Sequence, residues 1–312
     1  MMRPLDLFTP LAVLAFATTI ATGVSAQDFI EPQACELEIT ADSAIDWRGL
    51  YGRGYEVFEP GEYSEVVMVE IRHMGPPCEF FLTAASIGAG SRPALMGPSD
   101  MLYYDLRREP SGPSIFSPDF LGDQFSRISG QFGAGFQSQS ALLYLTIPAG
   151  QAVRGGAYAG QPILRVFRDD MDGPDLLDEV TVDVSVPVPA VLSVELADAG
   201  PGVRAMDIDL GDLGRSVERT VFFEVRSNAQ IVASVSSQNR GTLAHFAGAP
   251  GIPYRLMLAD KEVDLDNPAT TVSLNNTSAL YQPVPLNIQI DGNENAAAGS
   301  YSDSVTVTFM VD

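Results

Sequence analysis

The residues that could do chemistry are few in this chain of 312 residues. The chain has two cysteines, Cys35 and Cys78, and two histidines, His73 and His245. Neither histidine stands in a pattern typical of nucleophilic catalysis, and we expect both to be surface or loop residues rather than general bases. Two thiols without nearby histidines lack the four ligands that zinc requires, so we expect no metal site.

Two loops resemble binding motifs only loosely. Residues 169–175 form an acidic turn in which Gly173 comes too early for an EF-hand calcium loop. Residues 130–135 are rich in glycine, but they lack the strand–helix junction with Lys that a phosphate-binding loop needs. We therefore expect no catalytic residue, no cofactor and no enzymatic activity. An exported hydrolase on a β-sandwich is the least favoured alternative.

The N-terminal segment predicts export. Residues 1–26 combine Arg3, an apolar run from Leu11 to Ile20 and the small-residue cleavage site Val24-Ser25-Ala26. The run is too short for a membrane helix and no stop-transfer charges follow it, so we expect a signal peptide and no membrane insertion. The mature chain would begin at Gln27.

Export places the two cysteines in an oxidising compartment. An even pair in an exported chain predicts a disulfide between Cys35 and Cys78. It would close a loop of about 43 residues, which stabilises a fold by roughly 3–4 kcal/mol on the chain-entropy estimate. The net charge of −22 disfavours nucleic acid and anionic membranes as partners.

Short alternating segments separated by turns run through the whole chain, and helical periodicity is absent. This pattern predicts an all-β protein made of β-sandwiches. The most regular segment is the last, where Val305, Val307 and Phe309 would share one face of a strand. In the second half we also expect strands at Leu192–Leu196, Met206–Leu210, Arg219–Arg226, Ile231–Ser236, Ile252–Leu258, Glu262–Leu265, Thr271–Leu274 and Pro285–Ile290.

The two halves of the chain repeat each other. Two groups of residues match at one constant offset along the sequence: Leu143, Leu145 and Ile147 match Leu286, Ile288 and Ile290, and Gly156-Ala157-Tyr158 matches Gly299-Ser300-Tyr301. Tyr104-Asp105-Leu106 and Tyr254-Arg255-Leu256 correspond further upstream, at a slightly different offset. Hydrophobic alternation alone would also make two β domains look alike. The repeat predicts two related immunoglobulin-like domains, at residues 27–189 and 190–312.

These motifs resemble a known family. An early Cys is followed about 40 residues later by a second, then by a Leu-x-Tyr-x-Leu motif at 102–106 and by Gly-x-Tyr-x-Asp with Val-Thr-Val-Thr at 299–308. The pattern is similar to the spore coat protein U-like domain, which is shared with pilins of archaic chaperone–usher pili. It covers nearly all of the mature chain, twice. The first copy departs at Gly160, where the family has Asp, and the second copy lacks cysteines.

The resemblance implies immunoglobulin-like sandwiches that lack one strand. In that family a periplasmic chaperone lends a strand during export, and the neighbouring subunit replaces it in the fibre. Here the first copy continues into Leu177–Val188, which could be its own missing strand or an interdomain linker. The second copy stops after Val305, Val307 and Phe309, so we expect these residues to line a groove for a donor strand.

The N-terminus would not serve as a donor strand. Residues 27–34 are short, polar and interrupted by Pro32. A subunit that accepts a strand without donating one resembles a two-domain tip adhesin. The implied partners are a periplasmic chaperone, an outer-membrane usher, an adjacent pilin, and an abiotic or host surface colonised by a biofilm. The alternative is a secreted coat protein that assembles without a chaperone.

Two apolar loop clusters are candidates for the surface contact. One contains Trp47, Leu50, Tyr51 and Tyr55, and the other contains Ile115, Phe116, Phe120 and Leu121. Exposed apolar loops at the end of a sandwich would form an adhesive surface, although such residues can equally cap the core. We expect Leu50, Tyr51, Phe116 and Phe120 to make the contact.

Overall fold

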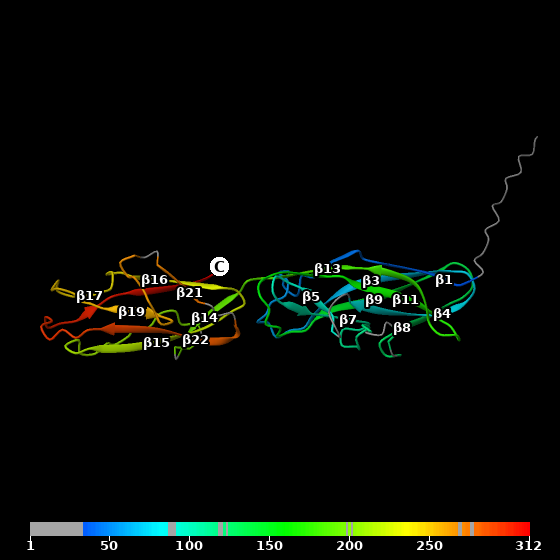
Figure 1. Ribbon diagram of the computed structural model, residues 1–312. Coiled ribbons are helices and arrows are strands. Elements are labelled where there is room, and N and C mark those ends of the chain that lie inside the picture. The colour runs from blue at the N-terminus through cyan, green and yellow to red at the C-terminus, as the bar shows by residue number, and fades with distance from the viewer. Residues whose placement is uncertain are drawn as a thin grey trace, which may run out of the picture. The chain divides into compact units, whose positions relative to one another are not determined.

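The computed structural model describes residues 34–86, 92–117, 121–122, 124–197, 199–200, 202–267, 270–274 and 278–312. The expected signal peptide and Phe120 lie outside these residues. As the sequence predicted, the described part is all-β, with strands in several sheets (Figure 1). Among the described residues we find no helix of the length and apolarity needed to cross a membrane.

Three sheets enclose the core of the first half. The first sheet has the order β1 (Glu36–Ala41), β3 (Tyr63–Met74), β9 (Gln137–Ile147), β7 (Asp105–Arg107). The second has the order β2 (Ala44–Asp46), β13 (Asp183–Val188), β10 (Gly156–Gly160), β5 (Ala94–Met96), β6 (Met101–Tyr103). The third has the order β12 (Asp175–Thr181), β11 (Pro162–Asp169), β4 (Cys78–Ser86), β8 (Ile128–Phe132).

The second half has a smaller set of sheets around its own core. The largest sheet has the order β14 (Leu192–Leu196), β15 (Val217–Ser227), β22 (Ser278–Ile290), β19 (Arg255–Leu258), β20 (Lys261–Glu262). The other two have the orders β21 (Thr271–Leu274), β16 (Ile231–Ser237), β24 (Val305–Val311) and β18 (Ile252–Pro253), β17 (Thr242–His245), β23 (Tyr301–Ser302). We call the two halves the first and second sandwich.

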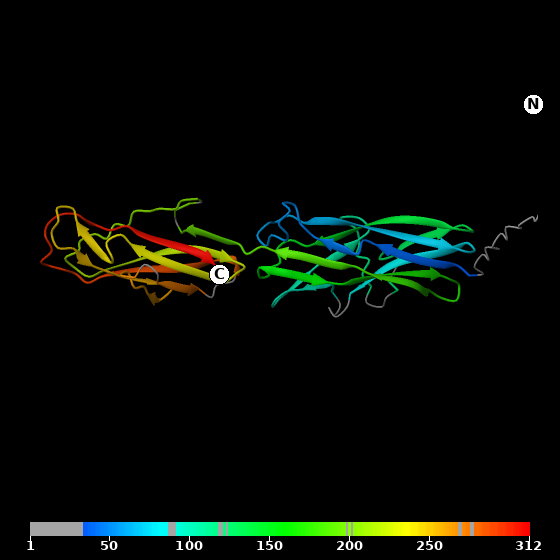
Figure 2. The same ribbon diagram turned by 90° about the horizontal axis from the view of Figure 1, so that it is seen from above.

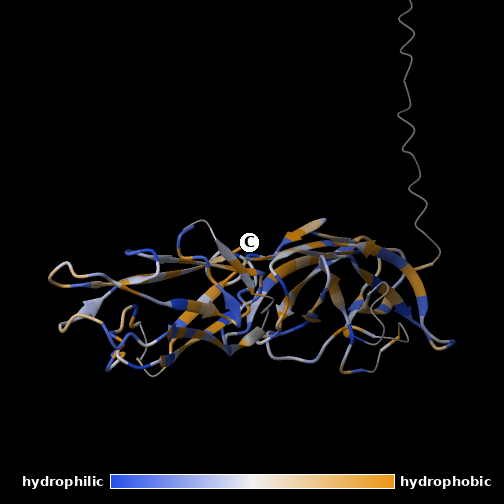
Figure 3. Cartoon of the chain, turned by 60° about the vertical axis from the view of Figure 1, so that its left-hand side comes forward, coloured by the Kyte–Doolittle hydropathy of each residue, from blue (hydrophilic) through white to orange (hydrophobic). Residues whose placement is uncertain are grey.

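The alternation seen in the sequence sets which residues are buried. Hydrophobic and hydrophilic residues alternate along the strands in Figure 3, and the hydrophobic ones gather into two separate cores. The first core contains buried residues from Cys35 to Val188, and the second contains buried residues from Val225 to Ile290. The domain boundary expected at residues 189–190 stays a prediction.

The repeat is also present in the strand pairing. In the first sandwich Asp105 and Leu106 of β7 pair with Thr146 and Leu145 of β9. In the second, Arg255 and Leu256 of β19 pair with the residues of β22 that match Thr146 and Leu145 in the repeat, which are Gln289 and Ile288. The two sandwiches can therefore be compared residue by residue.

Four expected strands differ from the structure. One is Glu262–Leu265, of which only Glu262 lies in a strand, β20. The segment Leu177–Val188 is not one strand, because it divides at Val182 into β12 and β13, which belong to different sheets. The segment Ile252–Leu258 divides in the same way into β18 and β19. Met206–Leu210 forms no strand, although Ile208 and Leu210 pack against the second core.

Candidate functional site

The last strand of the second sandwich has one paired edge. β24, the red strand that ends at the C-terminus in Figure 2, pairs along its length with β16. Among the described residues, its other edge has no strand partner. The preceding strand β23 pairs only with β17, through Ala244–Ser302 and His245–Tyr301, so its second edge also lacks a described partner.

The matching strands of the first sandwich are paired on both edges. β11 pairs with β4, as β24 pairs with β16, but β11 also pairs with β12. Similarly, β10 pairs with β5 and also with β13. In the first sandwich the segment 175–188 therefore lies beside β10 and β11. In the second sandwich no described strand fills the equivalent position beside β23 and β24.

The missing neighbour leaves the second core partly uncovered. In the first sandwich Tyr158 and Leu164 are fully buried, and so are Val184 and Val186 of the added strand at 2% and 0% exposure. The positions that match Tyr158 and Leu164 are Tyr301 and Val307, and both are only half-buried. Phe309 is half-buried too and packs edge-on against Phe223 with ring centroids 5.1 Å apart. The predicted groove residues Val305, Val307 and Phe309 thus lie together against the second core with incomplete cover.

A cavity of about 550 Å³ lies beside β23, next to the position that no described strand fills. It is lined by residues 208–214, by Asn293 and Glu294, and by residues 296–301. The segment around Ile208 follows β14 and precedes β15, as β2 follows β1 and precedes β3 in the first sandwich. There β13 runs between β10 and β2, antiparallel to the first and parallel to the second. The cavity therefore lies between the counterparts of the two strands that hold β13.

The sequence did not indicate the role of Asp303, which lies at the rim of this site. Its carboxylate accepts hydrogen bonds from the hydroxyl of Tyr254 and from Oγ of Ser237, both at 2.5 Å. The other carboxylate oxygen accepts from the backbone N–H groups of Asn239 and Ser304, at 3.0 and 2.8 Å. Burial raises the pKa of Tyr254, and its hydrogen bond to Asp303 raises the pKa further. Asp303 thus joins the Gly-x-Tyr-x-Asp motif to the Tyr-x-Leu motif at 254–256, whose last two residues lie in β19.

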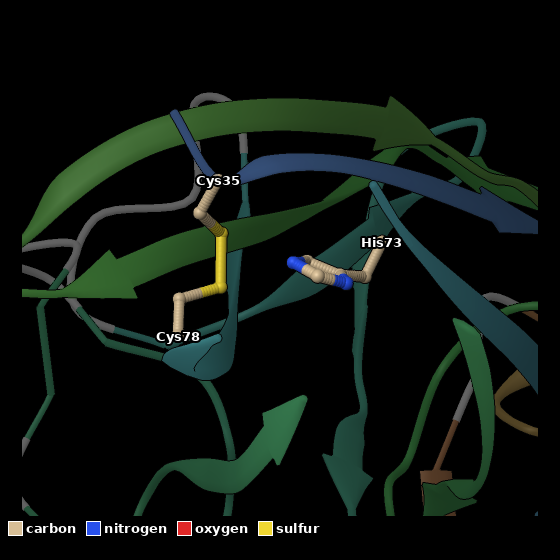
Figure 4. Close-up of side chains that lie close together, drawn as sticks. All are labelled: Cys35, His73 and Cys78. Atoms are coloured by element: carbon tan, nitrogen blue, oxygen red, sulfur yellow. A yellow bond between two sulfur atoms is a disulfide. The ribbon is translucent and has the colours of Figure 1, made fainter. Parts of the chain in front are cut away.

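The predicted disulfide is confirmed. Cys35 and Cys78 are joined, with their Cα atoms 6.2 Å apart (Figure 4). The expectation that His73 is a surface or loop residue was wrong, because it lies on β3 with 1% of its area exposed. The premise that the thiols have no nearby histidine was also wrong, since a His73 ring nitrogen and both sulfur atoms lie within 4.8 Å of one another. Both cysteine sulfurs are in the disulfide, so they do not offer a metal-binding dithiol.

The predicted contact residues have different environments. Leu50 and Tyr51 are 69% and 60% exposed, whereas Trp47 and Tyr55 of the same cluster are buried in the first core. Phe116 is half-buried and packs edge-on against Tyr104 at 5.5 Å, so it is less available than expected. The hydroxyl of Tyr55 anchors the loop by donating to the carbonyl of Pro148.

No family model and no curated protein matches the sequence. Several solved structures resemble the chain at low identity. One is the complex of chaperone CsuC with the tip adhesion subunit CsuE of archaic Csu pili from Acinetobacter baumannii. The matched chain is 13% identical, the match covers 88% of this chain and 99% of that chain, and the TM-score is 0.39. The CupB6 tip adhesin of Pseudomonas aeruginosa is 10% identical, with coverages of 88% and 94% and a TM-score of 0.42. CfaE, the adhesive subunit of CFA/I fimbria of enterotoxigenic Escherichia coli, is 12% identical, with coverages of 86% and 92% and a TM-score of 0.40.

Proposed function

We propose that the protein is the tip adhesin subunit of a chaperone–usher pilus. Its second sandwich accepts a donor strand, first from a periplasmic chaperone and then from the neighbouring pilin after export through an outer-membrane usher. Its first sandwich attaches the fibre to an abiotic or host surface, as in biofilm formation. The activity is binding and assembly, without catalysis.

One observation carries the proposal. The same strand position is filled in the first sandwich by residues 175–188 and is open in the second, where β23 and β24 have free edges among the described residues. An open edge beside half-buried apolar residues favours pairing with an added strand, because main-chain hydrogen bonds give affinity and alternating side chains enter the gaps. The pilin-like motifs at 299–308 lie in the strands that border this position.

The difference between the sandwiches supports a position at the tip of the fibre. The first sandwich already contains its strand, with Val182, Val184, Val186 and Val188 buried at 3% exposure or less. It therefore needs no strand from another subunit and is free to contact a surface. A chaperone-independent coat protein, the alternative, would have to fill the groove with another copy of this chain.

Co-expression with a candidate periplasmic chaperone tests the proposal. We expect a stable one-to-one complex to be purified from the periplasm. Val307→Asp should abolish the complex, because it places an unpaired charge at the groove. Thr306→Asp is the matched control, since Thr306 is exposed on the opposite face of β24, and it should leave the complex intact.

Three outcomes would contradict the proposal. The mature protein would stay monomeric with every candidate chaperone, or Thr306→Asp and Val307→Asp would affect the complex equally. Fibres formed by the purified mature protein alone would support the coat-protein alternative.

A further inference from the structure

We propose that the donor strand for the second sandwich follows the register of residues 175–188 but carries a small residue where that segment has Val184. This inference rests on the proposed function and specifies the partner. The occupant is an extended segment of another protein, running antiparallel to β23 and β24. The first sandwich serves as a template for the completed second sandwich.

The register follows from the pairs in the first sandwich. There Val186 lies opposite Tyr158, Val184 opposite Gly160, and Val180 opposite Leu164. The repeat matches Tyr158, Gly160 and Leu164 to Tyr301, Asp303 and Val307 of the second sandwich. A donor in this register would pair first with β24 and then with β23, and would change sheets between them as the template does at Val182.

At most of the compared positions the two sandwiches have side chains of similar size beside the donor. Tyr158 and Tyr301 are identical, so the donor residue opposite Tyr301 should be β-branched like Val186. The pair Leu164–Ala84 is replaced by Val307–Val235, in which one side chain is smaller and its neighbour larger. The donor residue opposite Val307 can therefore stay apolar and of the size of Val180.

The position of Gly160 is the exception. Gly160 has no side chain to oppose Val184, and even a Cβ there would come within 2.9 Å of Leu95. Asp303 instead presents a carboxylate that already accepts four hydrogen bonds. Directly opposed residues in antiparallel strands have Cβ atoms about 5 Å apart. A valine there would remove water from a charged group and offer it no hydrogen bond, which disfavours binding. A small residue such as Ser leaves room for water.

This difference gives the groove a selectivity against the chain's own strand. Residues 175–188 suit the first sandwich, where Gly160 lies opposite Val184. The same segment from another copy would place Val184 against Asp303 in the second. In the complex between two copies of the chain, Asp303 would lose its water without gaining a hydrogen bond. This cost disfavours pairing between copies and favours a donor from a separate protein.

Labelled synthetic peptides test the inference by fluorescence anisotropy on the full mature protein. The parent peptide has the sequence of residues 175–188. Its Val184→Ser variant should bind about tenfold more tightly, which corresponds to about 1.4 kcal/mol. The matched control is the Val186→Ser peptide, which makes the same change opposite Tyr301 and should bind more weakly than the parent.

The reciprocal experiment changes Asp303 in the protein instead of the peptide. In Asp303→Gly the preference should reverse, so that the parent peptide binds at least as tightly as Val184→Ser. Asp303→Asn provides a second variant that keeps the shape of the side chain, and the preference for Val184→Ser should shrink there. Circular dichroism before titration shows that each variant is folded.

The outcomes separate this inference from the proposed function. If the parent peptide binds the wild-type protein as tightly as Val184→Ser, or if Asp303→Gly and Asp303→Asn both leave the preference unchanged, the inference is overturned and strand acceptance stands. If no peptide binds although a chaperone complex forms, the register is wrong. If neither a peptide nor a chaperone binds, the proposed function fails.

Discussion

Four buried tyrosines should make the free energy of unfolding sensitive to alkaline pH. Burial raises the pKa of Tyr55, Tyr104, Tyr158 and Tyr254 in each case, because the phenolate would lose its hydration. In the unfolded chain tyrosines ionise near pH 10. The folded state therefore keeps protons that the unfolded state releases, and the free energy of unfolding should fall as the pH rises above about 10.

Urea unfolding between pH 8 and pH 11.5 measures this effect. We expect a plateau up to about pH 10 and a decline above it, while absorbance at 295 nm shows these tyrosines ionising only on unfolding. Tyr254→Phe should reduce the decline, and Tyr51→Phe, at an exposed residue, should not. A free energy of unfolding that is constant to pH 11.5 would contradict the prediction.

The proposed surface contact can be tested by substitutions at Leu50 and Tyr51. Both are largely exposed, and the loop is fixed on the first core by Trp47 and Tyr55. Leu50→Ser combined with Tyr51→Ser should reduce attachment of piliated cells to a hydrophobic surface severalfold, because it removes exposed apolar area without removing core contacts. Pilus number, counted by electron microscopy, should not change. Met171→Ser is the control, since Met171 is 96% exposed elsewhere on the first sandwich.

At the scale of elements, the sequence predicted strands well where one segment pairs within one sheet. It predicted them poorly where the segment changes sheets or has no strand to pair with. The valines of Leu177–Val188 alternate in the sequence, and Val182, Val184, Val186 and Val188 are buried. This alternation could not reveal the change of sheet at Val182, which depends on pairing with β11 and β10. Met206–Leu210 alternates in the same way and forms no strand. Its counterpart β2 pairs only with β13, and the second sandwich has no such strand among its described residues. A strand requires a partner as well as a pattern.

The added strand of the first sandwich can be tested directly. Val186→Asp should destabilise the first sandwich by more than about 4 kcal/mol, because it buries an unpaired charge in the core. Ser185→Asp is the matched control, as Ser185 is exposed on the same strand, and should change the free energy of unfolding by less than about 0.5 kcal/mol. Urea unfolding measures both. Equal effects would show that β13 does not complete the first core.

At the scale of the whole molecule, the repeat and the cysteine pair predicted most of the architecture. Residues related by the constant offset between the two halves form equivalent strand pairs. The pattern of buried residues determines both the sequence repeat and the pairing. The contribution of Asp303 and the burial of His73 could not be predicted. Each depends on residues distant in sequence, Tyr254 for Asp303 and Phe132 for His73, whose ring stacks at 4.9 Å.

Two cores that differ in completeness should unfold separately. The first has its full set of strands and a disulfide, which stabilises it by roughly 3–4 kcal/mol. The second has Tyr301, Val307 and Phe309 half-buried, and full burial of a side chain of this size stabilises a fold by roughly 1.5–3 kcal/mol. We therefore expect two calorimetric transitions, of which the lower belongs to the second sandwich.

Two treatments assign the transitions independently. A dithiol reductant should lower only the upper one, because both cysteines lie in the first sandwich. A donor strand fused behind Asp312 through a flexible linker should raise only the lower one, since intramolecular binding stabilises the folded state of the sandwich that it completes. The same fusion carrying Val307→Asp should lose that rise. A single cooperative transition that responds to both treatments would mean that the two sandwiches unfold as one unit, and a lower transition indifferent to the fused strand would mean that the second sandwich is already complete.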